Sequence, residues 1–370
     1  MTTDYIPILP TKAGELSALG DLPAEVKAGF TPLFVIHPIT FDFETDMPSK
    51  TAAQHVSGLG KKIATAWGTD RAFLDPVFLS DEPVPDNAQD PVQTVIDGAA
   101  REGLHLVPVI RPGQFPDHTA VAARAHLDTG IGTCVRLSPR HWPTSPSRAQ
   151  ALDELLASVG VGPIDTDLVL DLGVEVRSEL AAELANMALQ SLPHAEAWRS
   201  LTLAGGSFPE NLSQIPKDRL TRLPRLEWHL FSQVRTEAVA AGLCIPAFGD
   251  YAIAHPDPST GDVDPRVMSI SAGLRYTIDG EWLVAKGGLF KGTGGRSLGG
   301  AAAIPVAQMI ASAPEFCGQD YSAGDAWIDQ TAHGATTGGS PQTWRRVGTN
   351  HHLTFVTENL STPPATSAGS

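Results

Sequence analysis

The chain has 370 residues, of which 42% are hydrophobic and 18% are charged, a composition typical of a globular protein with a substantial core. The length fits two domains, or one large α/β domain with extensions. The net charge of −15 argues against binding of nucleic acid or of an anionic membrane through bulk charge, and leaves room only for local basic pockets.

Three cysteines, Cys134, Cys244 and Cys317, lie far apart and form no CxxC pair. This spacing favours a reducing compartment, and we expect a cytoplasmic protein. The first residues show no basic region followed by a long apolar core, and no run approaches the roughly 18 apolar residues that span a bilayer. No membrane contact is therefore expected.

Eight short apolar segments recur along the first 250 residues, and each is rich in Val, Ile, Leu or Phe. Strands of a parallel sheet are buried on both faces, so continuous apolar runs of this length predict parallel strands. The segments are 5–9, 31–36, 71–79, 104–110, 132–138, 166–172, 198–204 and 243–250.

Helical patterns separate these strands. Within 91–103, Val92, Val95 and Ala99 recur at helical spacing. Strands that alternate with helices predict a (β/α)8 barrel, similar to a TIM barrel. A doubly wound sheet is the alternative, although no GxGxxG follows the first strand. Further helices are expected at 118–128, 147–160, 179–192 and 225–242.

The pattern changes after residue 250. Residues 272–288 contain two β-prone arms around Asp279-Gly280, which predicts a hairpin with a type I′ turn. A Gly-rich loop at 287–300 follows, and then a predicted helix at 301–313.

These patterns predict three regions. Residues 1–250 form the barrel, and 251–362 form a C-terminal extension that packs on it because its apolar runs are few and short. Residues 363–370 are small and polar, and a disordered tail is expected there.

Polar residues follow the ends of the predicted strands, where active sites form in barrels of this type. Burying a charge is costly unless it is paired, so these groups are expected to meet an anionic ligand or one another. In the second case Arg136 and Asp171 form a structural ion pair. The candidate catalytic residues are Asp75, Asp171 and Asp250, the candidate ligand-binding cations are Lys12, Arg111 and Arg136, and Glu15 and His37 lie at the same edge.

The predicted hairpin adds further candidate ligand-binding residues, Arg275, Tyr276 and Lys286. Together with the Gly-rich loop they could close over a bound phosphate or carboxylate as a lid. The alternative is a mobile surface loop, because Gly-rich loops are common.

The segment TWRRVGTNHHLTFVTENL, 343–360, carries two adjacent histidines. Asn350 or Thr349 is predicted to cap a helix that begins with His351 and His352. Adjacent side chains on a helix point about 100° apart, so the two histidines are not expected to share a metal, and one of them is expected to face outward.

Asn350, His351 and His352 are candidate ligand-binding residues, because a free helix start after Arg345 and Arg346 would present donors to an anion. This role requires that the helix start reach the barrel mouth. If the helix packs elsewhere, it is only a C-terminal anchor.

Common catalytic motifs are absent, since the chain contains no HExxH, no Walker loop and no GxSxG. If the protein is an enzyme, we expect a hydrolase or lyase of a phosphorylated or carboxylated substrate. A divalent metal would then be held by Asp75, Asp171 and Asp250, and the cofactor is otherwise unknown. The alternative is a non-catalytic scaffold whose extension binds a protein partner.

Four stretches of the chain resemble a known family. YIPILPTKAGELSAL, TPLFVI, LRYTIDGEWLVAKG and TWRRVGTNHHLTFV are similar to the beta family proteins, and the likeness runs from residue 5 to about residue 360. Members occur in bacteria, phages and prophages. The resemblance implies a phage or mobile-element setting, with a role in conflict between phage and host, and it implies no established activity.

One position departs from the family pattern. Members tend to carry an acidic residue near the end of the second strand, where this chain reads Phe34-Val35-Ile36. A carboxylate mechanism that uses this strand is therefore not expected here.

Overall fold

Eight parallel strands close into a barrel in the computed structural model, which describes residues 4–79, 89–114, 116–258, 269–292 and 297–361. The strand order is β1-β11-β9-β8-β7-β6-β5-β2, and β2 pairs with β1 to complete the ring. All eight predicted strands are confirmed, and the doubly wound alternative is excluded. The barrel strands are β1 Tyr5–Pro10, β2 Leu33–Val35, β5 Ala72–Asp75, β6 Leu106–Ile110, β7 Thr133–Leu137, β8 Thr166–Asp171, β9 Ser200–Gly205 and β11 Ala247–Asp250.

The strands bury apolar side chains on both faces. Ile8, Phe73 and Val169 belong to a cluster that fills the barrel interior. Their neighbours alternate to the outer face, where Leu9 and Leu74 pack against the helices. This two-sided burial explains why the strands are continuously apolar in sequence.

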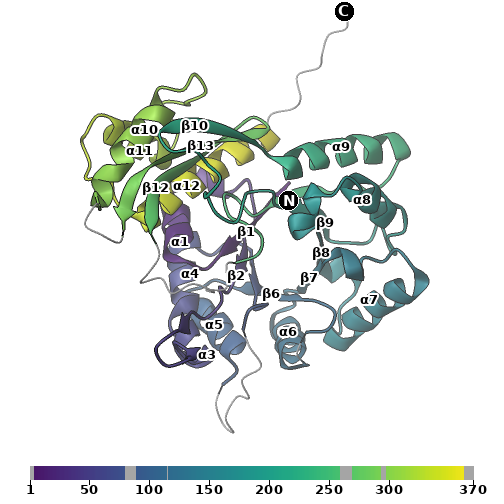
Figure 1. Ribbon diagram of the computed structural model, residues 1–370. Helices are drawn as coiled ribbons and strands as arrows, with labels where there is room; N and C mark the ends of the chain where they lie inside the picture. Colours follow the sequence, from purple (N-terminus) through teal and green to yellow (C-terminus); the bar gives the residue numbers. More distant parts are fainter. Residues whose placement is uncertain (1–3, 80–88, 115, 259–268, 293–296, 362–370) are drawn as a thin grey trace, which may run out of the picture.

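Helices surround the ring of strands (Figure 1). The five helices predicted between strands are confirmed, and Gly58 lies at the N-cap of a further helix, α4. Short 3-10 turns lie at Pro139–His141, Pro163–Asp165 and Gly173–Arg177. The helices are α1 Ala13–Gly20, α2 Ala24–Lys27, α3 Ala52–Val56, α4 Leu59–Trp67, α5 Pro91–Ala100, α6 Pro116–Thr129, α7 Pro146–Val159, α8 Ala181–Gln190 and α9 Leu226–Ala241, and a small hairpin, β3 Phe41–Asp42 with β4 Met47–Pro48, follows β2.

The hairpin of the extension is confirmed as β12 Ile270–Ile278 and β13 Glu281–Lys291. Its turn is not the predicted type I′, which needs a positive φ at both central residues: Gly280 has φ +66°, but Asp279 is not among the described residues with positive φ. A strand that the sequence did not predict, β10 Arg219–Pro224, pairs with β13 and completes a three-stranded sheet. A segment that precedes residue 250 thus belongs to this sheet.

Three helices cover the sheet: α10 Ile304–Ala311, α11 Ala323–Ala332 and α12 Pro341–Ser361. Leu274 and Tyr276 of the sheet share a hydrophobic core with Ile310, Ile328 and Val347 of these helices. Figure 1 shows this sheet and its helices gathered on one side of the barrel. The predicted helix at 301–313 is observed as a 3-10 turn, Gly299–Ala303, that continues into α10.

The predicted Gly-rich loop lies partly outside the described residues, and the predicted C-terminal tail lies wholly outside them. In the Gly-rich stretch 287–300, residues up to 291 extend β13, and 293–296 are outside the described part of the chain. The tail at 363–370 is also outside it. Within the described ranges, no helix has both the length and the apolar character needed to cross a membrane.

The C-terminal helix α12 begins at Pro341, so the prediction that it starts at the histidines was wrong. The true start signal is Ser340-Pro341: the Ser340 hydroxyl accepts from the Thr343 backbone, and proline suits the first helical position. His351 and His352 lie in mid-helix and both are fully buried, so the expectation that one faces outward was also wrong. The helix packs between α1 of the barrel and β12.

Candidate functional site

Four of the predicted mouth residues form one ion-pair network inside the barrel. Arg136 donates from Nη1 to Asp75 at 2.6 Å and from Nη2 and Nε to Asp171 at 2.6 and 2.9 Å. Arg111 forms a second ion pair with Asp75. Tyr251, which directly follows β11, donates its hydroxyl proton to Asp171 at 2.7 Å. The alternative of a structural Arg136–Asp171 pair therefore matches the observed contacts.

This network keeps Asp75 ionised. Burial raises the pKa of Asp75, but Arg111 and Arg136 outweigh it and hold that pKa below its ordinary value. Burial raises the pKa of Tyr251 well above its usual range. The backbone N–H of Gly173 also donates to Asp171, at 2.8 Å. Catalysis or metal binding by Asp75 and Asp171 stays a prediction, and within the described residues no three or more His, Cys, Asp or Glu side chains gather as a metal site would require.

Asp250 does not join the other two aspartates. On β11 it shares the outward face with Phe248, which packs among the outer-layer residues. Its carboxylate accepts from the Tyr5 hydroxyl at 2.8 Å, bonds His352 Nε2 at 2.8 Å, and lies 3.4 Å from Arg225. The three predicted carboxylates therefore do not converge, because the strand alternates its side chains between barrel interior and helix layer.

Tyr276 and His351 lie in a buried network between the sheet and α12. Their rings stack with centroids 3.7 Å apart. The Tyr276 hydroxyl donates to Asp325 at 2.7 Å, and His351 Nδ1 lies 2.8 Å from the other oxygen of Asp325. Burial and then Asp325 raise the pKa of Tyr276. Both side chains are satisfied by the protein and neither lines the barrel mouth.

Asn350 and Lys286 are likewise bonded to the protein itself. Asn350 accepts from the backbone of Gly324 at 2.8 Å and donates to the carbonyl of Ala18 at 3.1 Å, and it thereby joins α11 to α1. Lys286 donates to the carbonyl of Leu212 at 2.6 Å. The segment around residue 350 thus has the geometry of an anchor.

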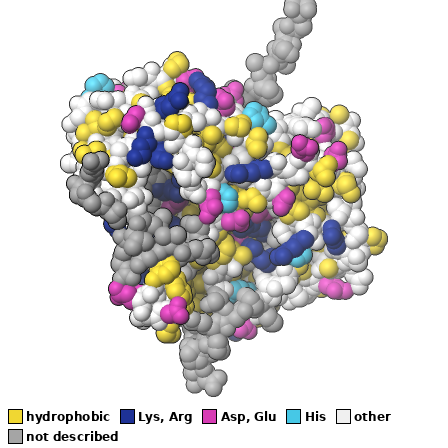
Figure 2. Space-filling view, in the orientation of Figure 1, with side chains coloured by type: hydrophobic (Ala, Val, Ile, Leu, Met, Phe, Trp, Pro, Cys, Tyr) yellow, Lys and Arg dark blue, Asp and Glu magenta, His cyan; other side chains and the backbone are white. Residues whose placement is uncertain are grey.

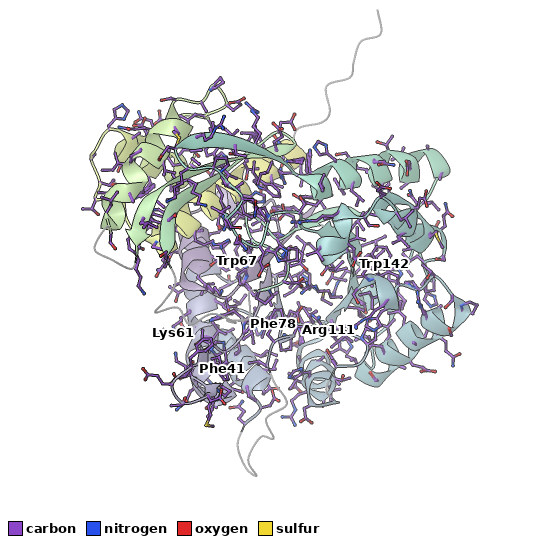
Figure 3. All side chains as sticks on the ribbon, in the orientation of Figure 1. Phe41, Lys61, Trp67, Phe78, Arg111 and Trp142 are labelled. Carbon is purple, nitrogen blue, oxygen red and sulfur yellow. The ribbon has the colours of Figure 1, made fainter. Side chains whose placement is uncertain are left out.

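A cavity of about 130 Å³ opens at the carboxyl ends of β1, β2, β7 and β11. Phe78, labelled near the middle of Figure 3, is one of the residues that line it. Its polar lining contains the predicted Lys12, Arg136 and Arg275, together with Glu15, Tyr251 and Arg345. Figure 2 shows Lys, Arg, Asp and Glu side chains interspersed over the face of the molecule that it draws.

Two arginines dominate the charge of this cavity. Arg275 of β12 and Arg345 of α12 both donate to the backbone carbonyl of Ile253, Arg345 at 3.2 Å. Arg345 Nε lies 3.4 Å from Glu15 Oε1. Burial, and next the charge of Arg345, lower the pKa of Arg275. The two guanidiniums thus share one carbonyl, and Arg345 also contacts the carboxylate of Glu15.

His37 adds a neutral polar group to the cavity wall. Burial, and then the neighbouring His55, lower the pKa of His37 to about 4, so the ring is uncharged at neutral pH. Its Nδ1 lies 3.1 Å from the Thr11 hydroxyl. Tyr251 is one of the cavity residues that the sequence did not single out. The signal was its place directly after the last barrel strand.

Solved structures with similarity to the chain include mutant tryptophan synthase α-subunits from Pyrococcus furiosus. They are 13% identical, with TM-scores of 0.37 and 0.36, over 66% of this chain and 85% of theirs. Ligand-free tryptophan synthase from M. tuberculosis matches at 13% identity and a TM-score of 0.32, over 68% of this chain and 83% of that chain. Since these TM-scores are low, the barrel assignment rests on the strand pairs themselves.

Comparison with curated proteins finds no match. The family model described as Beta protein, in contrast, matches residues 5–358. That range includes every barrel strand and nearly all of α12. The chain therefore belongs to the Beta protein family.

Proposed function

We propose that the barrel mouth binds a small molecule that carries a phosphate or carboxylate group. The observation that supports this most is the pair Arg275 and Arg345, which compete for the Ile253 carbonyl while Glu15 is the one buried carboxylate among the described residues of the cavity wall. A planar guanidinium presents donors that match a carboxylate or phosphate.

The charge balance of the cavity favours an anion. Arg136 is neutralised by Asp75 and Asp171, whereas Lys12 forms no ion pair with any described residue. Arg275 and Arg345, which are partly buried, therefore face one buried acid, and Lys12 adds an exposed cation whose charge water weakens. The carboxylates of Glu210 and Asp257 also line the cavity, but they are exposed, and water weakens their effect.

The size of the cavity limits the ligand. A volume of about 130 Å³ is close to the engineered cavity of roughly 150 Å³ that holds benzene. The ligand is thus a small metabolite or a small group at the end of a larger molecule that extends into solvent.

The ion pairs of Asp75 and Asp171 favour binding over catalysis. To act on a substrate, either carboxylate would first lose its partner Arg136 or Arg111. A hydrolase or lyase activity, which the strand-end carboxylates suggest, is the second candidate. A non-catalytic scaffold that captures a protein partner is the third, and the closed ion-pair network is the feature that favours it.

The setting of this function is a further part of the proposal. Membership of the Beta protein family, and the resemblance to members found in phages and prophages, support a phage or mobile-element context. The widely spaced cysteines support a cytoplasmic protein, and the acidic net charge argues against direct binding of nucleic acid. The identity of the neighbouring genes tests the context.

Thermal unfolding with a panel of anions tests the binding site. Inorganic phosphate, glycerol phosphate, malate and succinate are compared at constant ionic strength. A ligand at 100 times its Kd stabilises the folded state by about 2.7 kcal/mol, so the melting temperature rises with concentration. Arg275→Met should abolish the rise, whereas Arg222→Met, at an exposed arginine outside the cavity, should preserve it. If no anion in the panel raises the melting temperature, the proposal fails.

A further inference from the structure

Glu15 is the buried acid of the cavity, and the anion site alone gives it no role. It lies in the first turn of α1, directly after the first barrel strand, and is 4% exposed. An ionised carboxylate among anion-binding arginines weakens their attraction for an anion. Its presence in the wall therefore points to a second feature of the ligand.

The contacts of Glu15 leave it incompletely satisfied. Its closest cation is Arg345, at 3.4 Å, and its Oε2 is buried without a hydrogen-bond partner among the described residues. Buried polar atoms normally have such a partner. Burial raises the pKa of Glu15, although Arg345, Lys12 and Arg275 oppose that shift.

We propose that Glu15 binds a hydrogen-bond donor of the ligand, a hydroxyl or an ammonium group, while Arg275 and Arg345 hold its anionic group. This inference rests on the proposed anion site. Because Glu15 and Arg345 are in contact, the donor and the anionic group of the ligand lie only a few bonds apart. The ligand class is therefore a small hydroxy- or amino-substituted carboxylate, or the corresponding phosphate ester.

Matched probes separate the two parts of the site. Malate, aspartate and succinate share a carbon skeleton and two carboxylates, and only malate and aspartate add a hydroxyl or an ammonium group. Glycerol phosphate and propyl phosphate form the equivalent pair of phosphate esters. Isothermal titration calorimetry should give at least one donor-bearing probe an affinity about 10- to 100-fold above that of its matched analogue, as expected for a hydrogen bond to a charged group.

Glu15→Gln tests the role of the carboxylate. The variant should bind an ammonium-bearing probe and its unsubstituted analogue with nearly equal affinity. For a hydroxyl-bearing probe, the ratio of the two affinities should fall by a smaller factor. Its affinity for succinate or propyl phosphate should stay equal or rise, because a competing negative charge has been removed. Glu25→Gln, an exposed acid in the first turn of α2, is the matched control and should change neither quantity.

The outcomes separate a failure of the Glu15 role from a failure of the anion site on which it rests. If no probe binds the unaltered protein, the anion site itself fails. If the probes bind without preference for a hydroxyl or ammonium group, the role of Glu15 fails and the anion site stands. Retention of the full preference by Glu15→Gln would overturn the role as well, and its binding of succinate would show that the altered site is folded.

Discussion

Asp250 joins the barrel to the extension, and its replacement by alanine should destabilise the whole fold. The carboxylate is 1% exposed and meets Tyr5 of β1, His352 of α12 and Arg225 beside α9. Burial raises the pKa of Asp250, but His352 and Arg225 hold it below its ordinary value. Alanine would leave the guanidinium of Arg225, which is fully buried, without this partner.

The expected cost follows from this burial. Removing one partner of a buried ion pair costs about 3–5 kcal/mol when the remaining charge is uncompensated, and Glu227, which lies 3.4 Å from Arg225 and stays in place, should bring the cost toward the lower end of that range. That is a large share of a total stability of about 5–15 kcal/mol. Asp250→Asn keeps an acceptor for Tyr5 and should cost less. Asp21→Ala breaks the exposed pair with Arg346 and should cost at most about 1 kcal/mol.

Urea unfolding followed by circular dichroism measures these differences. The midpoint of Asp250→Ala should fall well below that of the unaltered protein, and the midpoint of Asp21→Ala should stay close to it. Equal losses of unfolding free energy in the two variants would show that burial contributes nothing to the cost.

Three further variants test the packing and the charges. Asp75→Asn should lower the free energy of unfolding at pH 7. The difference from the unaltered protein should shrink below about pH 4, because a carboxyl with a depressed folded pKa loses its stabilising effect as the pH falls from the unfolded toward the folded pKa. A difference that stays constant from pH 7 to pH 2 would contradict this. Tyr276→Phe removes the hydroxyl between Asp325 and the Cys317 backbone and should cost about 1–3 kcal/mol by urea unfolding. An unchanged free energy of unfolding would show that the Tyr276–Asp325 hydrogen bond contributes little to stability. Gly348→Ala should cost about 1–3 kcal/mol, because its Cβ would lie 2.7 Å from the carbonyl oxygen of Arg275. Gly20→Ala, which has open space around it, should be neutral or stabilising. Equal free energies of unfolding for the two variants would argue against close packing of α12 on β12.

The barrel could be predicted because its strands leave a strong local signal. Each is a short run of apolar residues, and burial on both faces requires that pattern. Strand β10, RLTRLP, was missed since it is half exposed and reads as a loop. The same two-sided burial hid the direction of Asp250: when both faces are apolar, the sequence does not reveal which residues point into the barrel.

The candidate site was predicted only in part, because contacts between distant segments decide it. Arg136 and Arg275 could be chosen from strand ends and the hairpin, yet Arg136 is neutralised and Arg275 is not. In the sequence, His351 and His352 look like ligand-binding residues at a helix start. Their partners Asp325 and Asp250 lie 26 and 102 residues away, and only the fold brings them together.

Anion binding at the barrel mouth is proposed to depend on Arg275 and Arg345. Arg345 and Arg346 are neighbours on α12, but only Arg345 lines the mouth cavity, and Arg346 pairs with Asp21 at the surface. The decisive measurement is a calorimetric titration of malate and of glycerol phosphate into Arg345→Ala and Arg346→Ala at constant ionic strength. We expect a loss of affinity of about tenfold or more in the first variant and none in the second. Equal affinity in the two variants would contradict this expectation.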